Sequence, residues 1–165
     1  MPGVGKSFYG KKFSEIAEYK FYDLDFIIEK NCKMKINEIF DTKGEEYFRK
    51  NEKEMLNETV KNINENSVIA TGGGTPLNGN LMQFMNENGI TVWLNSDINY
   101  ILSNLKRQKN IRPLFKNSKN ISKKLSELYK LRHKTYAKSM IQIMINECTT
   151  PNLFTNTLLL STIAE

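Results

Sequence analysis

Cysteine, long apolar runs and signal-like segments are scarce in this sequence. Its two cysteines, Cys32 and Cys148, lie far apart and outside any CxxC pattern, so we expect neither a zinc site nor a disulfide framework. No apolar run approaches the roughly 18 residues that suggest a membrane-spanning helix. Lys6, Lys11 and Lys12 interrupt the only region that could resemble a signal peptide. We therefore expect a protein of the cytoplasm that has no membrane partner.

The chain also lacks internal repeats, low-complexity tails and linkers rich in Pro, Gly or Ser, so residues 1–165 are expected to form a single domain. An excess of Lys and Arg gives a net charge of +6 at pH 7. That charge suits nucleic acid or small polyanionic ligands equally well. The denser basic stretch, residues 106–134, lacks the interleaved aromatic residues of a base-stacking surface. We expect small anionic ligands, no nucleic-acid partner and a monomer.

Short runs of β-forming residues alternate with longer stretches in which apolar residues recur at helical spacing. The strand candidates are residues 20–25, 67–72, 91–95 and 140–145. This alternation predicts βαβ units, and hence a three-layer α/β/α fold in which helices cover both faces of a mainly parallel sheet.

The sequence opens with MPGVGKSFYG, in which Gly5, Lys6 and Ser7 match the end of the phosphate-binding pattern GxxxxGK[ST]. The opening glycine of this pattern would fall just before Met1, as would the strand that such a loop needs. We expect a strand ending in glycine before Met1 in a longer parent sequence; a flexible glycine-rich segment is the alternative. In the loop, Gly3 and Gly5 would let the backbone approach a phosphate. Lys6 would reach the outer phosphates, and Ser7 would bind Mg²⁺.

Two carboxylates and three glycines follow the first two strand candidates. Asp23 and Asp25 end the run KFYDLD, and residues two apart share one face of a strand, so both could point into one ligand crevice. One would hold the water shell of a metal, and the other would accept a proton or hydrogen bond from a substrate hydroxyl. Gly72, Gly73 and Gly74 would let a ring-shaped polar ligand approach the backbone. Solvated turn carboxylates and a plain glycine turn are the alternatives.

Three arginines stand beside distinctive neighbours: Arg49 in EEYFRKNE, Arg112 in NIRPLF and Arg132 in LRHKTY. A guanidinium group can grip a carboxylate or a phosphate through two hydrogen bonds, which lysine cannot do. Each arginine alone could be a solvated surface charge. The single histidine, His133, is expected at the surface, and Trp93 in the core.

The segments MPGVGKS, FYDLDFIIEK, INEIFDTKGEEYFRKNEKEML, IATGGG, RPL and LRHKTYAK occur in an order and spacing that resemble the shikimate kinase family, over nearly the whole chain. The resemblance implies a P-loop kinase of the nucleoside monophosphate kinase type, with five strands. It also implies the activity: phosphorylation of the 3-hydroxyl of shikimate with MgATP, which gives shikimate 3-phosphate for aromatic amino acid biosynthesis.

The resemblance further implies a role for each matching residue. The implied ATP-binding residues are Gly3, Gly5, Lys6, Ser7, Phe8, Arg107 and Arg112, and the implied metal ligands are Ser7 and Asp23. The implied shikimate-binding residues are Asp25, Arg49, Gly72, Gly73, Gly74 and Arg132, with Glu52 supporting Arg49. Lys6, Asp25 and Arg112 would be catalytic, with Asp25 as the base. Residues 26–60 would bind the substrate, and residues 108–120 would form a lid that excludes water.

The sequence departs from the family pattern in three places. The first strand, which is usually central, and the opening glycine are absent, and this would leave neighbouring strands with unpaired edges. Phe8 stands where Thr is usual, so one hydroxyl contact to a phosphate is expected to be lost. The segment PLF after Arg112 is usually PLL. The alternatives are a gluconate-type or nucleotide kinase on the same scaffold and an inactive or regulatory module that binds the same ligands.

Overall fold

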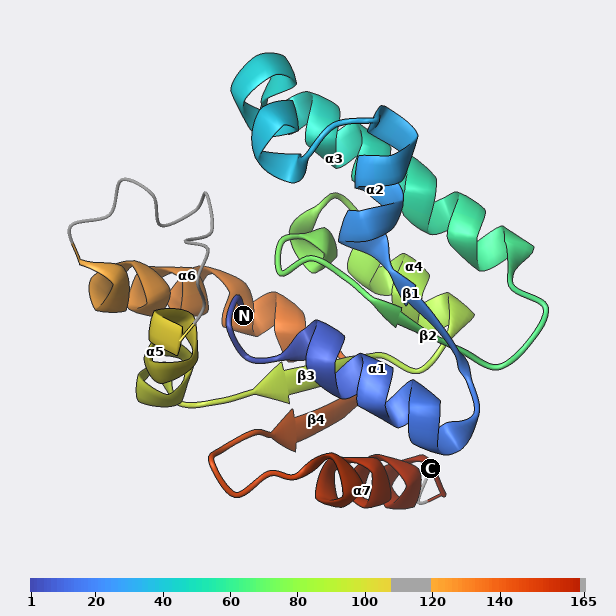
Figure 1. The fold of residues 1–165 in the computed structure, drawn as a ribbon, viewed down its shortest axis with the longest axis vertical. Helices are drawn as coiled ribbons and strands as arrows, with labels where there is room; N and C mark the ends of the chain where they lie inside the picture. Colours follow the sequence, from blue (N-terminus) through green and yellow to red (C-terminus); the bar gives the residue numbers. More distant parts are fainter. Residues whose placement is uncertain (108–119, 164–165) are drawn as a thin grey trace.

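The computed structural model describes residues 1–107 and 120–163, which form the expected three-layer α/β/α arrangement (Figure 1). In this part of the chain the strands are β1 (Lys20–Asp23), β2 (Ser67–Ala70), β3 (Val92–Asn95) and β4 (Ile141–Met144). The helices are α1 (Lys6–Ala17), α2 (Leu24–Cys32), α3 (Ile36–Asn62), the short η1 (Thr75–Leu77), α4 (Leu81–Asn88), α5 (Ile98–Arg107), α6 (Ile121–Tyr136) and α7 (Pro151–Ile163). The predicted lid, residues 108–120, lies outside the described residues except for Asn120, whose side chain caps α6.

All four predicted strands form, and their pairing is parallel as predicted. β1 pairs with β2 and β3 pairs with β4, each over four residues. Within the described residues no ladder joins β2 to β3, so the sheet layer consists of two pairs rather than one continuous sheet. β2 and β3 are thus each hydrogen-bonded to a described strand along one edge only.

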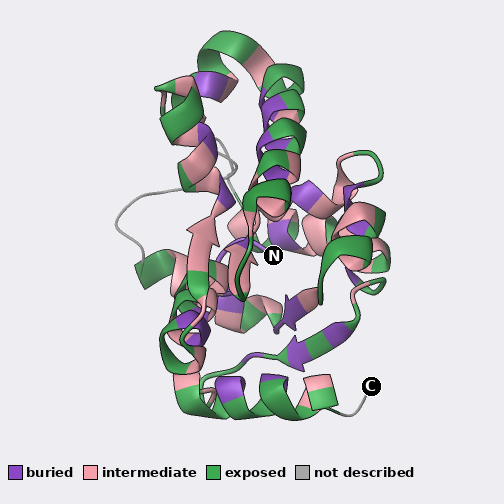
Figure 2. Ribbon diagram, turned by 90° about the vertical axis from the view of Figure 1, so that its right-hand side faces the viewer, coloured by how far each residue is buried: buried purple, intermediate pink, exposed green. Residues whose placement is uncertain are grey.

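Neighbouring residues of one strand point into different cores, and for this reason helices cover both faces. Val68 of β2 packs with the core of α1, β4 and α7, whereas the adjacent Ile69 packs with α2, α3 and α4. In β3, Leu94 belongs to the core of α1 and α7, and the adjacent Trp93 packs with α5 and α6. This is the alternation that a pleated strand imposes. Figure 2 shows the matching pattern on α3 and α7, whose buried residues face inward.

Helix α3 bends at Gly44, whose φ of 81° and ψ of 173° are not helical. A Cβ placed at this glycine would meet no atom within 4 Å, so backbone conformation and not space favours glycine here. The bend separates residues 36–43 from the longer part of α3, which carries Arg49. None of the helices in the described ranges is long and apolar enough to cross a lipid bilayer.

Candidate active site

The segment before α1 has the shape of a phosphate-binding loop. Gly3 and Gly5 have left-handed φ angles of 82° and 99°, which side chains rarely adopt. Lys6 Nζ donates a hydrogen bond to Met1 O at 3.2 Å, so the lysine side chain folds back over the loop. The loop also packs tightly on α5, because a Cβ placed at Gly3 would lie 2.9 Å from Leu105 Cγ. The chain thus presents the N-terminus of α1, where an anion is favoured.

Ser7 and Asp23 form a polar pair beside this loop. Ser7 Oγ donates to Asp23 Oδ2 at 2.8 Å. The other oxygen of Asp23 caps α2 by accepting from the backbone N–H groups of Asp25 at 3.1 Å and Phe26 at 3.4 Å. Nowhere in the described ranges do three His, Cys, Asp or Glu side chains gather to hold a metal by themselves. A hydroxyl and a carboxylate suit Mg²⁺, which keeps waters and phosphates as its other ligands.

Asp25 does not lie on a strand. The prediction that Asp23 and Asp25 share one face of a strand is wrong, because β1 ends at Asp23 and α2 begins at Leu24. Asp25 instead lies in the first turn of α2, where the helix dipole favours a carboxylate. It still reaches the predicted glycine segment, since a Cβ placed at Gly72 would lie 3.3 Å from Asp25 Oδ1.

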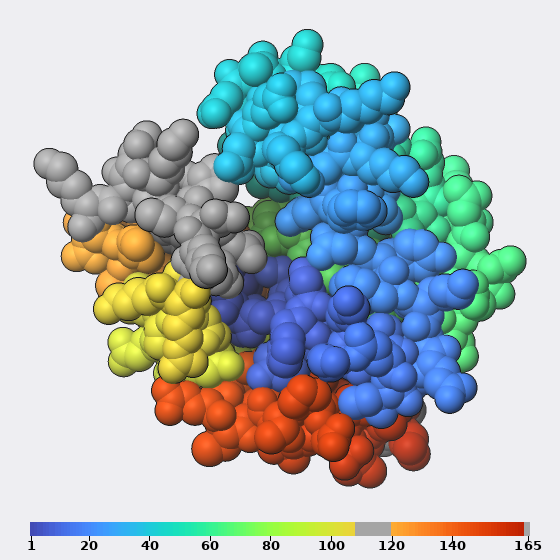
Figure 3. All heavy atoms as spheres, viewed as in Figure 1, coloured from blue at the N-terminus to red at the C-terminus, as the bar shows by residue number. Residues whose placement is uncertain are grey.

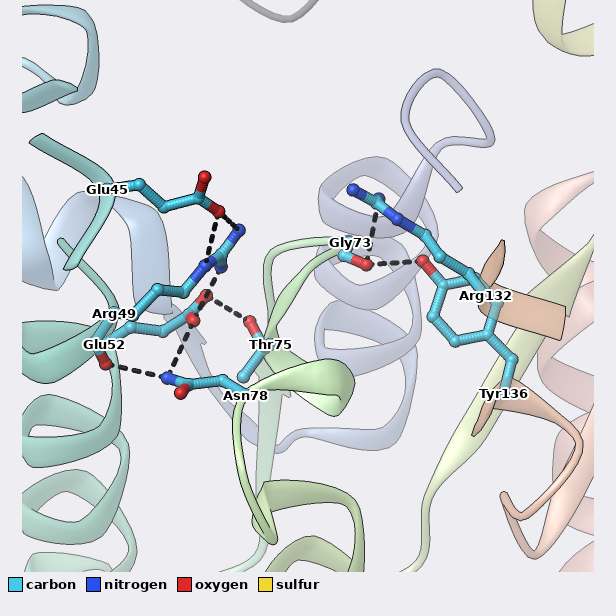
Figure 4. Close-up of polar contacts among 8 residues, drawn as sticks. All are labelled: Glu45, Arg49, Glu52, Gly73, Thr75, Asn78, Arg132 and Tyr136. Atoms are coloured by element: carbon cyan, nitrogen blue, oxygen red, sulfur yellow. Dashed lines mark hydrogen bonds and ion pairs between the residues drawn. The ribbon is translucent and has the colours of Figure 1, made fainter. Parts of the chain in front are cut away.

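The three consecutive glycines, Gly72–Gly74, form a loop between β2 and η1 that we call the glycine loop. None of them has a positive φ, so these positions need space and not an unusual backbone. A Cβ placed at Gly73 would lie 3.1 Å from Arg132 Nη1, and one placed at Gly74 would lie 2.8 Å from Arg49 Cζ. Figure 4 shows the two arginines on either side of this loop. Side chains on the glycine loop would therefore displace both guanidinium groups.

A buried carboxylate holds Arg49 in place. Glu52 is fully buried, and its Oε2 accepts from Arg49 Nη1 at 2.8 Å, which confirms the expected support (Figure 4). Thr75 Oγ1 donates to Glu52 Oε1 at 2.6 Å, and Asn78 Nδ2 donates to Arg49 O at 2.7 Å. Glu45 Oε1 accepts from Arg49 Nε at 3.2 Å and Nη2 at 3.1 Å. Burial acts to lower the pKa of Arg49, but the bonds and charges of Glu52 and Glu45 outweigh burial and raise it. Arg49 is therefore firmly cationic.

The second arginine is tied to the middle of the glycine loop. Gly73 O accepts from Arg132 Nη1 at 3.0 Å and also from the hydroxyl of Tyr136, one helical turn further along α6. Burial raises the pKa of Tyr136, so its hydroxyl stays protonated as a donor. Arg132 Nε is buried without a hydrogen-bond partner among the described residues. Buried donors are normally paired, so this N–H is an exception within the described part of the chain.

The phosphate-binding loop and the glycine loop lie against each other. A Cβ placed at Gly73 would lie 3.8 Å from the backbone nitrogen of Pro2. Figure 3 shows the N-terminal segment in dark blue and the start of α3 in cyan around a hollow, with green atoms from the middle of the chain at its base. The N-terminus of α1 and a pair of arginines therefore lie close to one another.

The other sequence-predicted residues lie as follows. Phe8 is exposed in the first turn of α1, and its ring contacts that of Tyr9 edge-to-face. Arg107 is exposed at the end of α5, and Arg112 lies outside the described residues. His133 is half-buried and stacks on Tyr129 of the same helix, α6. Trp93 lies in the core, as predicted.

The sequence analysis missed four side chains of the site: Glu45, Thr75, Asn78 and Tyr136. Helical spacing could have indicated Glu45 and Tyr136, since each lies four residues from one of the site arginines and hence on the same helix face. Thr75 and Asn78 directly follow the glycine loop, but nothing in the local pattern indicates their bonds to α3.

Known proteins similar to this chain agree on one family. A family model described as shikimate kinase matches residues 2–162. A shikimate kinase of Sulfurihydrogenibium sp. is 39% identical over 141 residues, which are 86% of this chain and 81% of the relative. A structure of Acinetobacter baumannii shikimate kinase in complex with shikimate matches with a TM-score of 0.88 and 31% identity, over 99% of this chain and 90% of that one. The Aquifex aeolicus enzyme matches with a TM-score of 0.78 and 31% identity, over 98% and 90%.

The substitution Gly74→Ala tests the close contact between the glycine loop and Arg49. The backbone at Gly74 has a φ of −95° and a ψ of −19°, which alanine adopts without strain. Its Cβ would push the guanidinium of Arg49 away from Glu52, so we expect the free energy of unfolding to fall by about 1–3 kcal/mol. Urea denaturation measures the change. Gly89→Ala is the control, because that backbone is extended, with a φ of 171°, and its Cβ would meet open space. Equal stability of the two variants would contradict the contact.

Proposed function

This chain belongs to the shikimate kinase family, and we propose that it transfers the γ-phosphoryl group of ATP to the 3-hydroxyl of shikimate, which gives shikimate 3-phosphate. The observation that carries the proposal is the contact between the phosphate-binding loop and the glycine loop, at Pro2 and Gly73. A kinase needs its phosphate-binding and acceptor sites side by side, because phosphoryl transfer depends on positioning and charge neutralisation. The shikimate bound in the Acinetobacter baumannii relative supports the acceptor.

We propose that Arg49 and Arg132 bind the carboxylate of shikimate from opposite sides of the glycine loop. Arg49 is charged and held in position by Glu52, and the guanidinium of Arg132 is bonded to the glycine loop at Gly73 O. Charge-assisted bonds from two guanidinium groups both hold and orient a carboxylate. Gly72, Gly73 and Gly74 would line the ring of the substrate. Asp25 would accept a hydrogen bond from the reacting hydroxyl and act as the base.

On the nucleotide side, Gly3, Gly5 and Lys6 would bind the outer phosphates of ATP at the N-terminus of α1. Ser7 and Asp23 would hold Mg²⁺, which when bound neutralises part of the charge on the phosphates. Asp23 would keep this position during the reaction, because it also caps α2.

Several further roles stay predictions. Arg112, the predicted catalytic residue, and residues 108–119 of the predicted lid lie outside the described residues. Within the described residues, no contact of Arg107 supports its predicted ATP-binding role. Other expectations also stay predictions. They are the single domain 1–165, its substrate-binding part at residues 26–60, the monomeric state, the cytoplasmic location and the lack of nucleic-acid or membrane partners. A role in aromatic amino acid biosynthesis follows from the proposed product.

The alternatives are less well supported. The paired arginines favour an acceptor with a carboxylate over a nucleotide. Gluconate has such a carboxylate, but the family match and the relatives described above favour shikimate. Nothing in these comparisons favours an inactive or regulatory module.

A coupled assay of ADP release tests the proposed activity. We expect ADP release that requires both shikimate and Mg²⁺. Asp25→Asn keeps the shape of the side chain but removes the base, so kcat should fall by about 100-fold or more. Asp41→Asn, at an exposed position of α3, is the matched control and should leave the rate unchanged. Absence of shikimate-dependent ADP release, or equal release with gluconate, would contradict the proposal.

A second prediction concerns Phe8, which follows Ser7 in the first turn of α1 and is 53% exposed. Phe8→Thr would restore a hydroxyl next to the phosphates, and one such hydrogen bond of about 1 kcal/mol should lower KM for ATP by about fivefold. Phe8→Val is the control, because valine has nearly the shape of threonine but no hydroxyl. Steady-state kinetics at saturating shikimate measures the effect. An equal KM for the Thr and Val variants would show that no phosphate contact forms at this position.

A further inference from the structure

Arg49 already holds a carboxylate at the edge where an incoming ligand would bind. Its Nη1 donates to the buried Glu52 at 2.8 Å, and its other two nitrogens, Nε and Nη2, donate to one oxygen of Glu45 at 3.2 and 3.1 Å (Figure 4). A guanidinium group binds a carboxylate best through two neighbouring N–H groups. The pair formed by Nε and Nη2 offers such an edge, and Glu45 occupies it.

We propose that Glu45 sets the affinity for the substrate, because it takes the place of the substrate carboxylate on Arg49 and is displaced when shikimate binds. The inference rests on the proposed function, because it assumes that Arg49 receives the carboxylate of shikimate. It adds a competing group within the chain, on the same helix as the arginine that it occupies.

The two glutamates that hold Arg49 differ in how easily they can leave. The side chain of Glu52 is 1% exposed, and it also accepts bonds from Thr75 and Asn78. The side chain of Glu45 is 67% exposed, and within the described residues its hydrogen bonds all go to Arg49. An exposed ion pair of this kind contributes little to stability. Glu45 is therefore the partner that a ligand can displace, while Glu52 keeps the guanidinium in place.

The backbone next to Glu45 also allows this exchange. Gly44 precedes it with a φ of 81°, interrupts α3 and has open space around its Cα. Glu45 thus stands at the start of the helical segment that follows the bend, where the helix dipole favours a negative charge whether or not Arg49 is bound. Release of the carboxylate into water would leave that stabilisation intact.

This arrangement has a consequence for ligand affinity. A ligand carboxylate that binds the Nε and Nη2 edge of Arg49 must first displace Glu45, while the ion pair with Glu52 keeps the guanidinium neutralised throughout. Glu45 therefore lowers the affinity for any ligand that uses this edge.

Calorimetric titration of shikimate in the absence of ATP tests the inference in the wild type, Glu45→Gln and Glu46→Gln. Glu46 is the matched control, because it is exposed and lies in the same helical turn, and the described carboxylates that bond Arg49 are Glu45 and Glu52 instead. We expect Glu45→Gln to bind shikimate about two- to fivefold more tightly, and Glu46→Gln to bind it like the wild type. In turnover, KM for shikimate should fall in Glu45→Gln while kcat and KM for ATP stay the same.

The outcomes separate the inference from the function on which it rests. The inference is overturned, and the function stands, if the wild type binds shikimate and Glu45→Gln binds it no more tightly. The same holds if the affinity of Glu46→Gln for shikimate rises as much as that of Glu45→Gln. If none of the three proteins binds shikimate, the proposed function is overturned and the inference falls with it.

Discussion

Glu52 has no access to water, and its negative charge is balanced by Arg49 at 2.8 Å. A carboxylate in such a place needs a cation and further donors, because removing one member of a buried pair costs about 3–5 kcal/mol. Thr75 and Asn78 supply those donors from the segment after the glycine loop. The same bonds that satisfy Glu52 therefore fasten α3 to that segment and point Arg49 at the site.

The glycine loop connects this part of α3 to α6 and to the phosphate-binding loop. Because its glycines have no side chains, Arg49 can approach the loop at Gly74. At the middle of the loop, Gly73 O accepts hydrogen bonds from Arg132 and Tyr136 of α6. Gly73 also lies against Pro2 of the phosphate-binding loop. Three helices and two loops thus meet around a few atoms of backbone, and substitutions there should disturb both the acceptor side and the nucleotide side.

Local patterns in the sequence were sufficient to predict the four strands and their parallel pairing, whereas the support of Arg49 by Glu52 was implied by the family resemblance. They failed where a local interaction competes with a pattern: Asp23 caps α2, so Asp25 leaves the strand that its alternating spacing suggested. They also failed where the partner is distant in sequence, since the bond from Thr75 to Glu52 spans 23 residues. The division of the sheet layer into two pairs depends on hydrogen bonding between strands, which a one-dimensional pattern does not contain.

The central claim is that two arginines, positioned in advance around the glycine loop, recognise a carboxylate. The most direct measurement compares the binding of shikimate by the unmodified chain with that of an analogue in which a hydroxymethyl group replaces the carboxylate. Loss of charge-assisted bonds from two guanidinium groups amounts to about 3 kcal/mol or more, so the analogue should bind about 100-fold more weakly or worse. Equal affinity for the two compounds would contradict the account.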